Sequence, residues 1–319
     1  MKIKKQTPSV TIAISAYNEE ENIKSFLESV LMQKEEGYQL KGIWVYSDGS
    51  TDKTVKIVRS FSTKKITLIP FSKRIGKSSR LNIIYKKLKT DILIQSDADV
   101  IFTHPYIVRD IIQPLVKNQK VGMCGGNPTP VAGESFTEQA VNCTFTIYQR
   151  FRSFVRGGNN VFSADGRLLA FSKSLVKKIH IPEDMIANDM YAYFCCLSLG
   201  YEYRFVKTAV VYFRSPNSLQ DHIRQNIRFE AAPIRMKRYF SKQLIESEIN
   251  IPGTIFISSA LLEFMKHPLL CSFILFINLY CRIIASLMEA KMTAIWTIAY
   301  STKRYSNRRL FSYETKKNS

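Results

Sequence analysis

Cysteine and histidine are scarce in this 319-residue chain, and neither is arranged to bind a metal ion. The six cysteines include no C-x-x-C pair, and the four histidines have no ligand-like spacing to them. The spacing therefore predicts no zinc site. Free thiols, and amino-terminal residues without the apolar core of a signal peptide, lead us to expect a reducing, cytosolic compartment.

Acidic residues are also few, since 26 Asp and Glu stand against 46 Lys and Arg, for a formal net charge of +20. This excess predicts a polyanionic partner, which could be nucleic acid, an anionic membrane surface or a phosphorylated substrate. Internal repeats and low-complexity linkers are absent from the sequence. The length suits one large domain with an appendage, or two smaller domains.

Short apolar runs alternate with amphipathic stretches in the first part of the chain. The runs cover residues 10–15, 42–46, 66–70 and 92–95, with a further strand expected at 121–126. This repetition predicts an α/β fold with a parallel sheet and right-handed crossovers. Beyond residue 133 we expect a long helix (134–155), a strand (166–171), a helix (188–199), strands (201–206 and 209–213) and a basic helix (219–240) bent near Pro233.

Acidic residues follow two of these strands. Asp48-Gly49-Ser50-Thr51-Asp52 ends one strand, and Asp97-Ala98-Asp99 ends another. Ligands of open parallel sheets collect beyond the carboxyl ends of the strands. Two carboxylates can present hard oxygens to Mg²⁺ or Mn²⁺ that grips a diphosphate. An isolated Asp-x-Asp is often a solvated turn, but its position after a buried strand favours a nucleotide and metal site.

The carboxyl-terminal part is apolar from residue 254 and most apolar in Pro268–Met288, which is long enough to cross a bilayer. Asn278 and Arg282 interrupt this run, and an arginine at depth costs about 2.5 to 3.5 kcal/mol. The basic tail at 303–317 favours the cytoplasmic side and anionic lipid. We therefore expect helices in the cytoplasmic leaflet; one span, or an ordinary buried helix, is the alternative.

Several motifs, in order, resemble those of the family 2 glycosyltransferases, which transfer sugars from nucleotide donors on a GT-A fold. The resemblance covers about residues 8–240. Asn188 stands where the family usually has Glu before its catalytic Asp, and Phe229 stands where processive members have Trp. The matching segments are Ala16-Tyr17-Asn18-Glu19, Asp48-Gly49-Ser50-Thr51-Asp52, Gly76-Lys77, Asp97-Ala98-Asp99, Asn188-Asp189 and Gln225-Asn226-Ile227-Arg228-Phe229.

The resemblance implies a GT-A domain at 1–250, with a donor half at about 8–127 and an acceptor half at about 128–250. Membrane-associated apolar helices and a basic tail would follow at 251–319. It further implies that Asp48 accepts a hydrogen bond from the base, that Tyr17 packs on the base and that Glu19 reaches the ribose. Ala16 and Ala98 complete the donor site, and Lys77, at a helix start, steadies the diphosphate. The alternative is that both residues have only structural roles: Asp48 would be a turn residue, and Glu19 a favourable charge on the first turn of a helix.

The metal and the reaction follow from the same resemblance. Asp99 would be the direct metal ligand, with Asp97 sharing the cation or holding the ribose. Asp189 would be the general base of an inverting displacement, or else merely the cap of its helix. Gln225 and Arg228 would contact the acceptor or the diphosphate. Arg224, Arg235 and Lys242 recur on the same helix face as Arg228 and would complete a cationic wall, or a solvated face.

These expectations describe a metal-dependent inverting glycosyltransferase that uses a nucleotide-sugar, with UDP the carrier implied by resemblance. The acceptor would be lipid-linked or a polysaccharide, at the cytoplasmic face of the membrane, in cell-surface glycan synthesis. We expect no nucleic-acid partner, because four aspartates beside a basic groove would repel phosphates. A sugar nucleotidyltransferase and a non-catalytic basic membrane- or nucleic-acid-binding protein are the alternatives.

Overall fold

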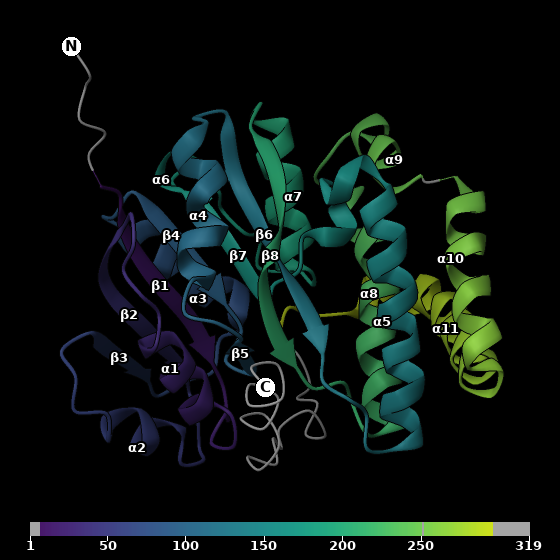
Figure 1. Cartoon of the computed structure of the whole chain (residues 1–319), viewed down its shortest axis with the longest axis horizontal. Coiled ribbons are helices and arrows are strands. Elements are labelled where there is room, and N and C mark those ends of the chain that lie inside the picture. The colour runs from purple at the N-terminus through teal and green to yellow at the C-terminus, as the bar shows by residue number, and fades with distance from the viewer. Residues whose placement is uncertain (1–6, 251, 296–319) are drawn as a thin grey trace, which may run out of the picture.

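A computed structural model describes residues 7–250 and 252–295, and its core is one eight-stranded sheet (Figure 1). The order across the sheet is β3-β2-β1-β4-β7-β6-β8-β5. The strands are β1 (Ser9–Ala16), β2 (Gln39–Asp48), β3 (Ile66–Phe71), β4 (Ile92–Ser96), β5 (Val100–Phe102), β6 (Val121–Pro130), β7 (Leu168–Ser172) and β8 (Glu202–Phe213).

The sheet is parallel in its first half, as predicted, and mixed in its second half. Strands β3, β2, β1 and β4 pair in parallel, and so do β6 and β8. Strand β7 runs antiparallel between β4 and β6, and β5 runs antiparallel to β8. The prediction of parallel strands, made from residues 10–126, is therefore confirmed, and β7 from the second half of the chain inserts antiparallel between β4 and β6. The expected strands at 201–206 and 209–213 are one continuous strand, β8.

Helices cover both faces of the sheet, and strand alternation decides which side chains meet which helices. In β1, Ile12 and Ile14 face one apolar cluster and Ala13 faces the other. The first cluster includes α1 (Ile23–Leu31), α2 (Thr54–Arg59) and α4 (Ile107–Lys117). The second includes α3 (Lys77–Lys87), α6 (Lys173–Val176), α7 (Asn188–Ser198) and α9 (Lys242–Ile249). Both faces are closed, which leaves the carboxyl ends of the strands for ligands.

A flank of long helices stands beside the sheet (Figure 1). It consists of α5 (Phe136–Phe154), α8 (Leu219–Met236), α10 (Gly253–Lys266) and α11 (Pro268–Met288). Helix α5 starts at a capping box, in which the Ser135 side chain and the Glu138 side chain each bond the other's backbone N–H. Helix α8 contains Pro233 but ends at Met236, so Lys242 lies on the separate helix α9. The predicted single basic helix to residue 240 was therefore too long.

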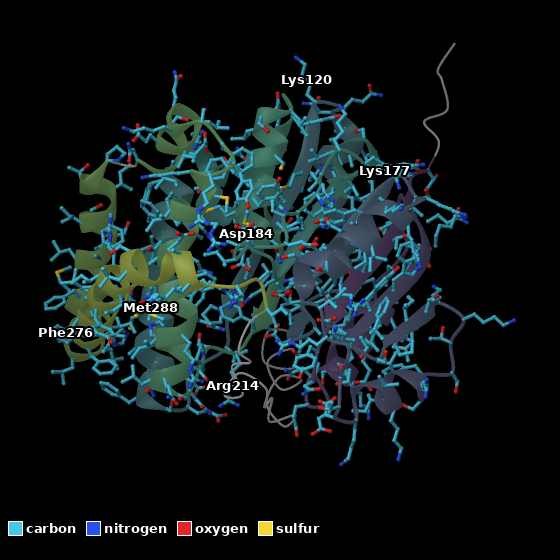
Figure 2. The ribbon with its side chains drawn as sticks, turned by 180° about the vertical axis from the view of Figure 1, so that it is seen from behind. Lys120, Lys177, Asp184, Arg214, Phe276 and Met288 are labelled. Atoms are coloured by element: carbon cyan, nitrogen blue, oxygen red, sulfur yellow. The ribbon has the colours of Figure 1, made fainter. Side chains whose placement is uncertain are left out.

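The carboxyl-terminal helices form the outer side of this flank. Among the described residues, one segment, Pro268–Lys291, is long and apolar enough to cross a membrane, with a mean hydropathy of 1.9. Only 22% of its apolar window is buried. Phe276 and Met288 mark this helix, which lies far from Lys177 at the other end of the molecule (Figure 2). The basic tail predicted to meet anionic lipid lies outside the described residues.

Candidate active site

The loops after β1 and β2 are held together by their own polar groups. The side chain of Asn18, which has a φ of 52°, accepts a hydrogen bond from the N–H of Thr51 at 2.8 Å. The N–H of Glu19 donates to the hydroxyl of Thr54 at 2.7 Å. These bonds bring Tyr17 and Glu19 beside the loop that follows Asp48, as the sequence predicted. The face of the Tyr17 ring is covered by the guanidinium of Arg74, 3.9 Å from its centre.

Asp48 is buried and organises the loop that leads into α3. Its carboxylate accepts hydrogen bonds from the N–H groups of Ile75 at 3.0 Å and Gly76 at 2.8 Å, and from Nε of Arg80 at 2.6 Å. The Arg80 guanidinium also stacks on Phe71, 3.5 Å from the ring centre. A carboxylate has about four acceptor positions, so these three protein donors leave little capacity for a base. The role of Asp48 in base recognition stays a prediction, whereas its structural role is visible.

Asp97 and Asp99 are half-buried in the loop that follows the fully buried strand β4. The ammonium of Lys77, at the first position of α3, forms an ion pair with Oδ1 of Asp97. Burial lowers the pKa of Lys77, but the charges of Asp97, Asp189 and Asp99 outweigh it, and the pKa is raised overall. Lys77 is therefore a permanent positive charge beside the acidic loop, where an anionic diphosphate would need it.

The acidic loop supplies two carboxylates. Among the residues that the structure describes, no three His, Cys, Asp or Glu side chains are grouped so as to hold a metal ion by themselves. Mg²⁺ and Mn²⁺ are often held by one or two carboxylates together with substrate phosphates and water. Asp97 and Asp99 fit a divalent cation that binds with its diphosphate, and they do not fit a structural metal. All six cysteines are free and buried.

Asp189 lies in the first turn of α7, where its charge also acts on Lys77. Its Oδ2 accepts a hydrogen bond from the N–H of Gly166 at 3.1 Å, and its Oδ1 accepts one from the N–H of Met190 at 2.9 Å. Burial raises its pKa, and the charge of Asp165 adds to that rise, while Lys77 and the two N–H donors act in the other direction. The net effect is a carboxylate more basic than an ordinary aspartate, which a general base requires.

The preceding residue, Asn188, is buried against α3. Its Oδ1 accepts a hydrogen bond from the hydroxyl of Ser78 at 2.8 Å. This contact ties the start of α7 to the residue after Lys77, so the carboxylate of Asp189 and the ammonium of Lys77 keep a fixed relation. A methyl group built on Gly166 would lie 3.5 Å from Nζ of Lys77 and 3.6 Å from Oδ2 of Asp189.

Two charged residues of this site were missed by the sequence analysis, Asp165 and Arg167. Strand β7 pairs antiparallel with β4, with Ser96 opposite Leu168, and the Ser96 hydroxyl donates to the carbonyl of Arg167 at 2.7 Å. Asp97 directly follows Ser96, and Arg167 directly precedes its partner Leu168, so both residues lie at the same end of the β4–β7 pair. Arg167 bonds Asp165 at 2.8 Å and lies 3.8 Å from the centre of the Phe213 ring. The available signal was the Asp165-Gly166-Arg167 segment at the start of the strand predicted for 166–171, but the sequence could not show which strand would pair with it.

Of the basic residues expected along α8, the structure brings one to the site. Burial lowers the pKa of Arg228 to about 10, although the charges of Asp189 and Asp97 raise it, so Arg228 lies in the field of both carboxylates. Gln225 is half-buried one turn earlier. Arg224 is exposed and pairs with Asp221 at 3.5 Å.

The predicted cationic wall was otherwise wrong. Arg235 is 1% exposed and bonds to Glu289 and Asp184, and Lys242 pairs with Glu246 on α9 at 3.7 Å. Helical spacing predicted that Arg235 lies on the same face of α8 as Arg228. At Arg235, however, this face is packed against the segments of Asp184 and Glu289, so Arg235 does not reach the site.

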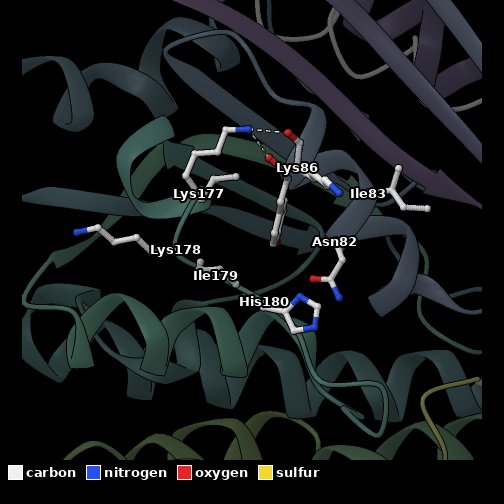
Figure 3. Close-up of a pocket in the computed structure, with 9 residues that line it drawn as sticks. Asn82, Ile83, Lys86, Lys177, Lys178, Ile179 and His180 are labelled. Carbon is white, nitrogen blue, oxygen red and sulfur yellow. Dashed lines mark hydrogen bonds between the residues drawn. The ribbon is translucent and has the colours of Figure 1, made fainter.

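A pocket of about 510 Å³ lies at the other end of α3, between that helix and the segment after α6 (Figure 3). Lys177 closes one side by donating to the carbonyls of Tyr85 at 3.0 Å and Lys86 at 2.7 Å. These bonds satisfy carbonyl groups near the end of α3. The pocket contains none of the residues predicted to bind the donor, the metal or the acceptor, so it is separate from the candidate active site.

Comparison with known proteins shows the family of the chain. The sequence profile described as "Glycosyl transferase family 2" matches residues 11–180, more than half of the chain. A poly-beta-1,6-N-acetyl-D-glucosamine synthase from Staphylococcus epidermidis is 24% identical over 233 residues, which are 70% of this chain and 54% of that protein. The Staphylococcus aureus protein of the same name is 25% identical over 229 residues, covering 69% and 53%. The chain thus spans about half the length of these curated relatives.

The fold is also that of a solved transferase. The structure of a mannosyltransferase from Pyrobaculum calidifontis, in complex with GDP-Man and Mn²⁺, superposes with a TM-score of 0.66 at 17% identity, covering 89% of this chain and 87% of that one. At this identity the likeness establishes the fold. It agrees with the GT-A arrangement that the sequence motifs implied.

Proposed function

We propose, for a chain that belongs to glycosyl transferase family 2 and has its GT-A fold, that Asp189 activates a sugar acceptor beside a nucleotide-sugar held by the two acidic loops. The protein is a glycosyltransferase, and its curated relatives are polysaccharide synthases. The family assignment favours transfer over the alternatives of a sugar nucleotidyltransferase or a non-catalytic binding protein. The observation that carries the proposal is that Gly166 lies against both Asp189 and Lys77, while Lys77 pairs with Asp97.

On the donor side, Ala16, Tyr17 and Glu19 would line the nucleoside, with Asp48 behind them and Ala98 between the two acidic side chains. Asp99 and Asp97 would hold Mg²⁺ or Mn²⁺ together with the diphosphate. When bound, such a cation supplies Lewis-acid stabilisation of the departing phosphate oxygens. Lys77 would bind the same anion, and its release from Asp97 would free that carboxylate for the cation.

On the acceptor side, Asp189 would take the proton of an acceptor hydroxyl as the hydroxyl oxygen attacks the anomeric carbon and the bond to the nucleoside diphosphate breaks. One base and one displacement give inversion of the anomeric configuration. The N–H of Gly166 keeps one carboxylate oxygen in place, and burial keeps the carboxylate basic. Arg228, with Gln225 one turn earlier, would face the acceptor or the diphosphate.

The donor class is proposed from the resemblance and from the names of the relatives. UDP is the expected carrier, and N-acetylglucosamine is the first sugar to test, because the relatives are named for a polymer of it. The acceptor is a lipid-linked glycan or a polysaccharide in cell-surface glycan synthesis. Phe229 stands where processive members of the family have Trp, and product analysis would show how many sugars are added.

We also propose that the protein works at the cytoplasmic face of the membrane, with α10 and α11 lying in one leaflet. Helix α11 has a buried stripe formed by Cys271, Ile274, Cys281 and Ala285, and an opposite exposed stripe. The exposed stripe contains Phe276 (73% exposed), Leu279 (58%), Ile283 (58%) and Leu287 (70%). An apolar surface of this kind, continued by Ile257, Leu261 and Met265 on α10, is typical of a helix that lies in the membrane interface.

The polar residue in the apolar run supports the interfacial arrangement over a span. Asn278 points toward the domain, where its amide bonds Asn226 at 2.8 Å and Thr144 at 3.3 Å and lies 3.1 Å from Nε2 of His222. A span by α11 would draw α8 and α5, with charges such as Glu230 and Arg150, into the hydrocarbon. On α10, Glu263 faces inward and pairs with Arg150 at 2.8 Å. Asn278 and Glu263 therefore face the domain while the outer surface is mainly apolar; an exception is Arg282, whose side chain is 79% exposed and lies 4.0 Å from Glu230.

The experiment that tests the proposed function is thermal unfolding of the detergent-purified chain against UDP-, GDP-, dTDP- and CMP-sugars, with and without Mn²⁺. A ligand at about 100 times its Kd stabilises by about 2.7 kcal/mol. We expect a metal-dependent shift with one nucleotide class, lost in Asp99→Ala and kept in Glu28→Gln, a surface control on α1. A folded protein that shifts with no member of the panel would contradict donor binding.

A further inference from the structure

Arg235, near the end of α8, is the largest of the fully buried side chains that the structure describes. Its three guanidinium nitrogens donate to five acceptors on two separate segments. On the first segment they bond the carbonyl and Oδ2 of Asp184, the latter at 3.2 Å. On the second they bond Oε1 of Glu289, the carbonyl of Glu289 at 2.7 Å and that of Met292 at 3.2 Å. A planar fork with several N–H groups can do this, whereas a lysine cannot.

The first segment leads into α7, the helix that carries Asp189. Asp184 stands five residues before Asp189, in the loop that ends where α7 begins. Met185 and Ile186, which follow Asp184, are buried, and the hydroxyl of Ser78 donates to the carbonyl of Met185 at 3.3 Å. Tyr239 adds a hydrogen bond from its hydroxyl to Oδ1 of Asp184. The loop is thus held at its outer end by Asp184 and at its inner end by α3.

The second segment leads out of α11 toward the donor side. Glu289, 5% exposed, directly follows that helix and also accepts from Arg238 at 2.6 Å. A few residues later the chain meets the start of α3. A Cβ built on Gly76 would lie 3.4 Å from Cγ1 of Ile295 and 3.5 Å from the carbonyl oxygen of Ala294.

The two segments are joined by a network of four ion pairs. Two guanidinium groups, those of Arg235 and Arg238, face the two carboxylates of Asp184 and Glu289. The side chains of Arg235 and Glu289 are only 1% and 6% exposed, so removing either one leaves the charge of the other buried without its main partner, which is strongly unfavourable. In Figure 2, Asp184 lies between the sheet and the helical flank that Met288 and Phe276 mark.

We propose that Arg235 is a positioning residue, which ties the loop before Asp189 to the end of the apolar helix α11 and thereby sets the position of the base. This proposal rests on the proposed function only because it takes Asp189 as the general base. The tie makes the placement of Asp189 depend, through this network of ion pairs, on how α11 is seated. A misplacement of about 1 Å in a reacting group can cost about 10²-fold in rate.

The test compares Arg235→Met with Arg238→Met, a matched control that removes the other, half-exposed guanidinium. Hydrogen–deuterium exchange is followed in the peptide covering 182–192, on the full chain without ligand. Initial rates are measured with the nucleotide-sugar that stabilises the chain most. We expect Arg235→Met to raise exchange in this peptide and to lower kcat about tenfold, with the donor KM within about twofold. Arg238→Met should change each by less.

Glu289→Gln tests the tie from its other end and serves if Arg235→Met does not fold. The Glu289 carboxylate bonds Arg235 and Arg238, and these two guanidinium groups in turn pair with the loop at 184, so the substitution acts on the loop through them. Faster exchange at 182–192 in Glu289→Gln would support the tie, and wild-type exchange there would overturn it. Faster exchange with an unchanged kcat would overturn the positioning role. A wild-type chain that transfers no sugar would contradict the proposed function alone, because the exchange result does not depend on turnover.

Discussion

The N–H of Gly166 donates to Oδ2 of Asp189 at 3.1 Å, and this bond joins the turn before β7 to the first turn of α7. Gly166 also lies against the ammonium of Lys77, at the start of α3. Three segments that are far apart in sequence therefore meet at one carboxylate. Because β7 pairs with β4, the same turn is fixed beside the acidic loop that holds Asp97.

Asp189→Asn should nearly abolish transfer while leaving donor binding intact. An amide keeps the shape of the side chain and can accept from Gly166, but it cannot take the acceptor proton. General-base catalysis is worth about 10²- to 10⁴-fold, and we expect a fall of that size in kcat. Initial rates at saturating donor, with Asp110→Asn on α4 as control, measure it. Turnover within about twofold of wild type would mean that another group is the base.

The acid limb of the pH profile of turnover should reflect the pKa of Asp189. Burial and Asp165 raise the pKa of Asp189 above its ordinary value of 3.8. Since a base works when deprotonated, turnover should rise with pH through an apparent pKa above that of an ordinary aspartate. Asp165→Asn removes one cause of the rise, so its acid limb should move to lower pH. A pH profile of kcat for both proteins checks this, and a limb that stays in place or moves upward would contradict it.

Arg80→Met should destabilise the fold far more than loss of a surface ion pair. Asp48 and Arg80 have side chains that are 3% and 4% exposed, and removing the guanidinium leaves a buried carboxylate unpaired. Breaking such a pair costs about 3 to 5 kcal/mol. The control is Lys24→Met, from an exposed pair with Glu28 at 3.9 Å, where about 0.5 kcal/mol or less is expected. Urea unfolding measures both, and equal losses would mean that Asp48 is well solvated.

The sequence predicted the parts of the site that lie on consecutive β and α elements. Asp48, Lys77 and the Asp97–Asp99 loop come directly after strands or at a helix start, so their common edge follows from the topology of a parallel sheet. The spacing of the runs also predicted the strands β1 to β4 and the helix α7 to within a few residues.

The parts that were missed depend on pairing between distant segments. Nothing in the sequence around Arg167 says that β7 inserts beside β4 in the opposite direction. Arg235 was assigned to the substrate side because helical spacing gives a face but not the element packed against that face. Its partners, Asp184 and Glu289, come from segments 51 and 54 residues away. Local pattern could not reveal such a contact.

Charged substitutions on the exposed stripe of α11 should weaken membrane binding without affecting the fold. Leu279→Glu and Ile283→Glu replace side chains that are each 58% exposed and make up part of the apolar surface. Because the stripe faces away from the domain, stability should change little, while binding of the double variant to vesicles that contain anionic lipid should fall about tenfold. Co-sedimentation with such vesicles measures it.

The matched control is Met32→Glu with Leu199→Glu, two exposed apolar residues at the ends of other helices, at 62% and 42% exposure. This control carries the same added charge, so it separates local loss of the apolar stripe from general repulsion by anionic lipid. If both double variants lose binding equally, charge alone attracts the protein and α11 does not lie in the leaflet. If the α11 variant instead changes the oligomeric state in detergent-free buffer, the stripe binds a second copy of the chain.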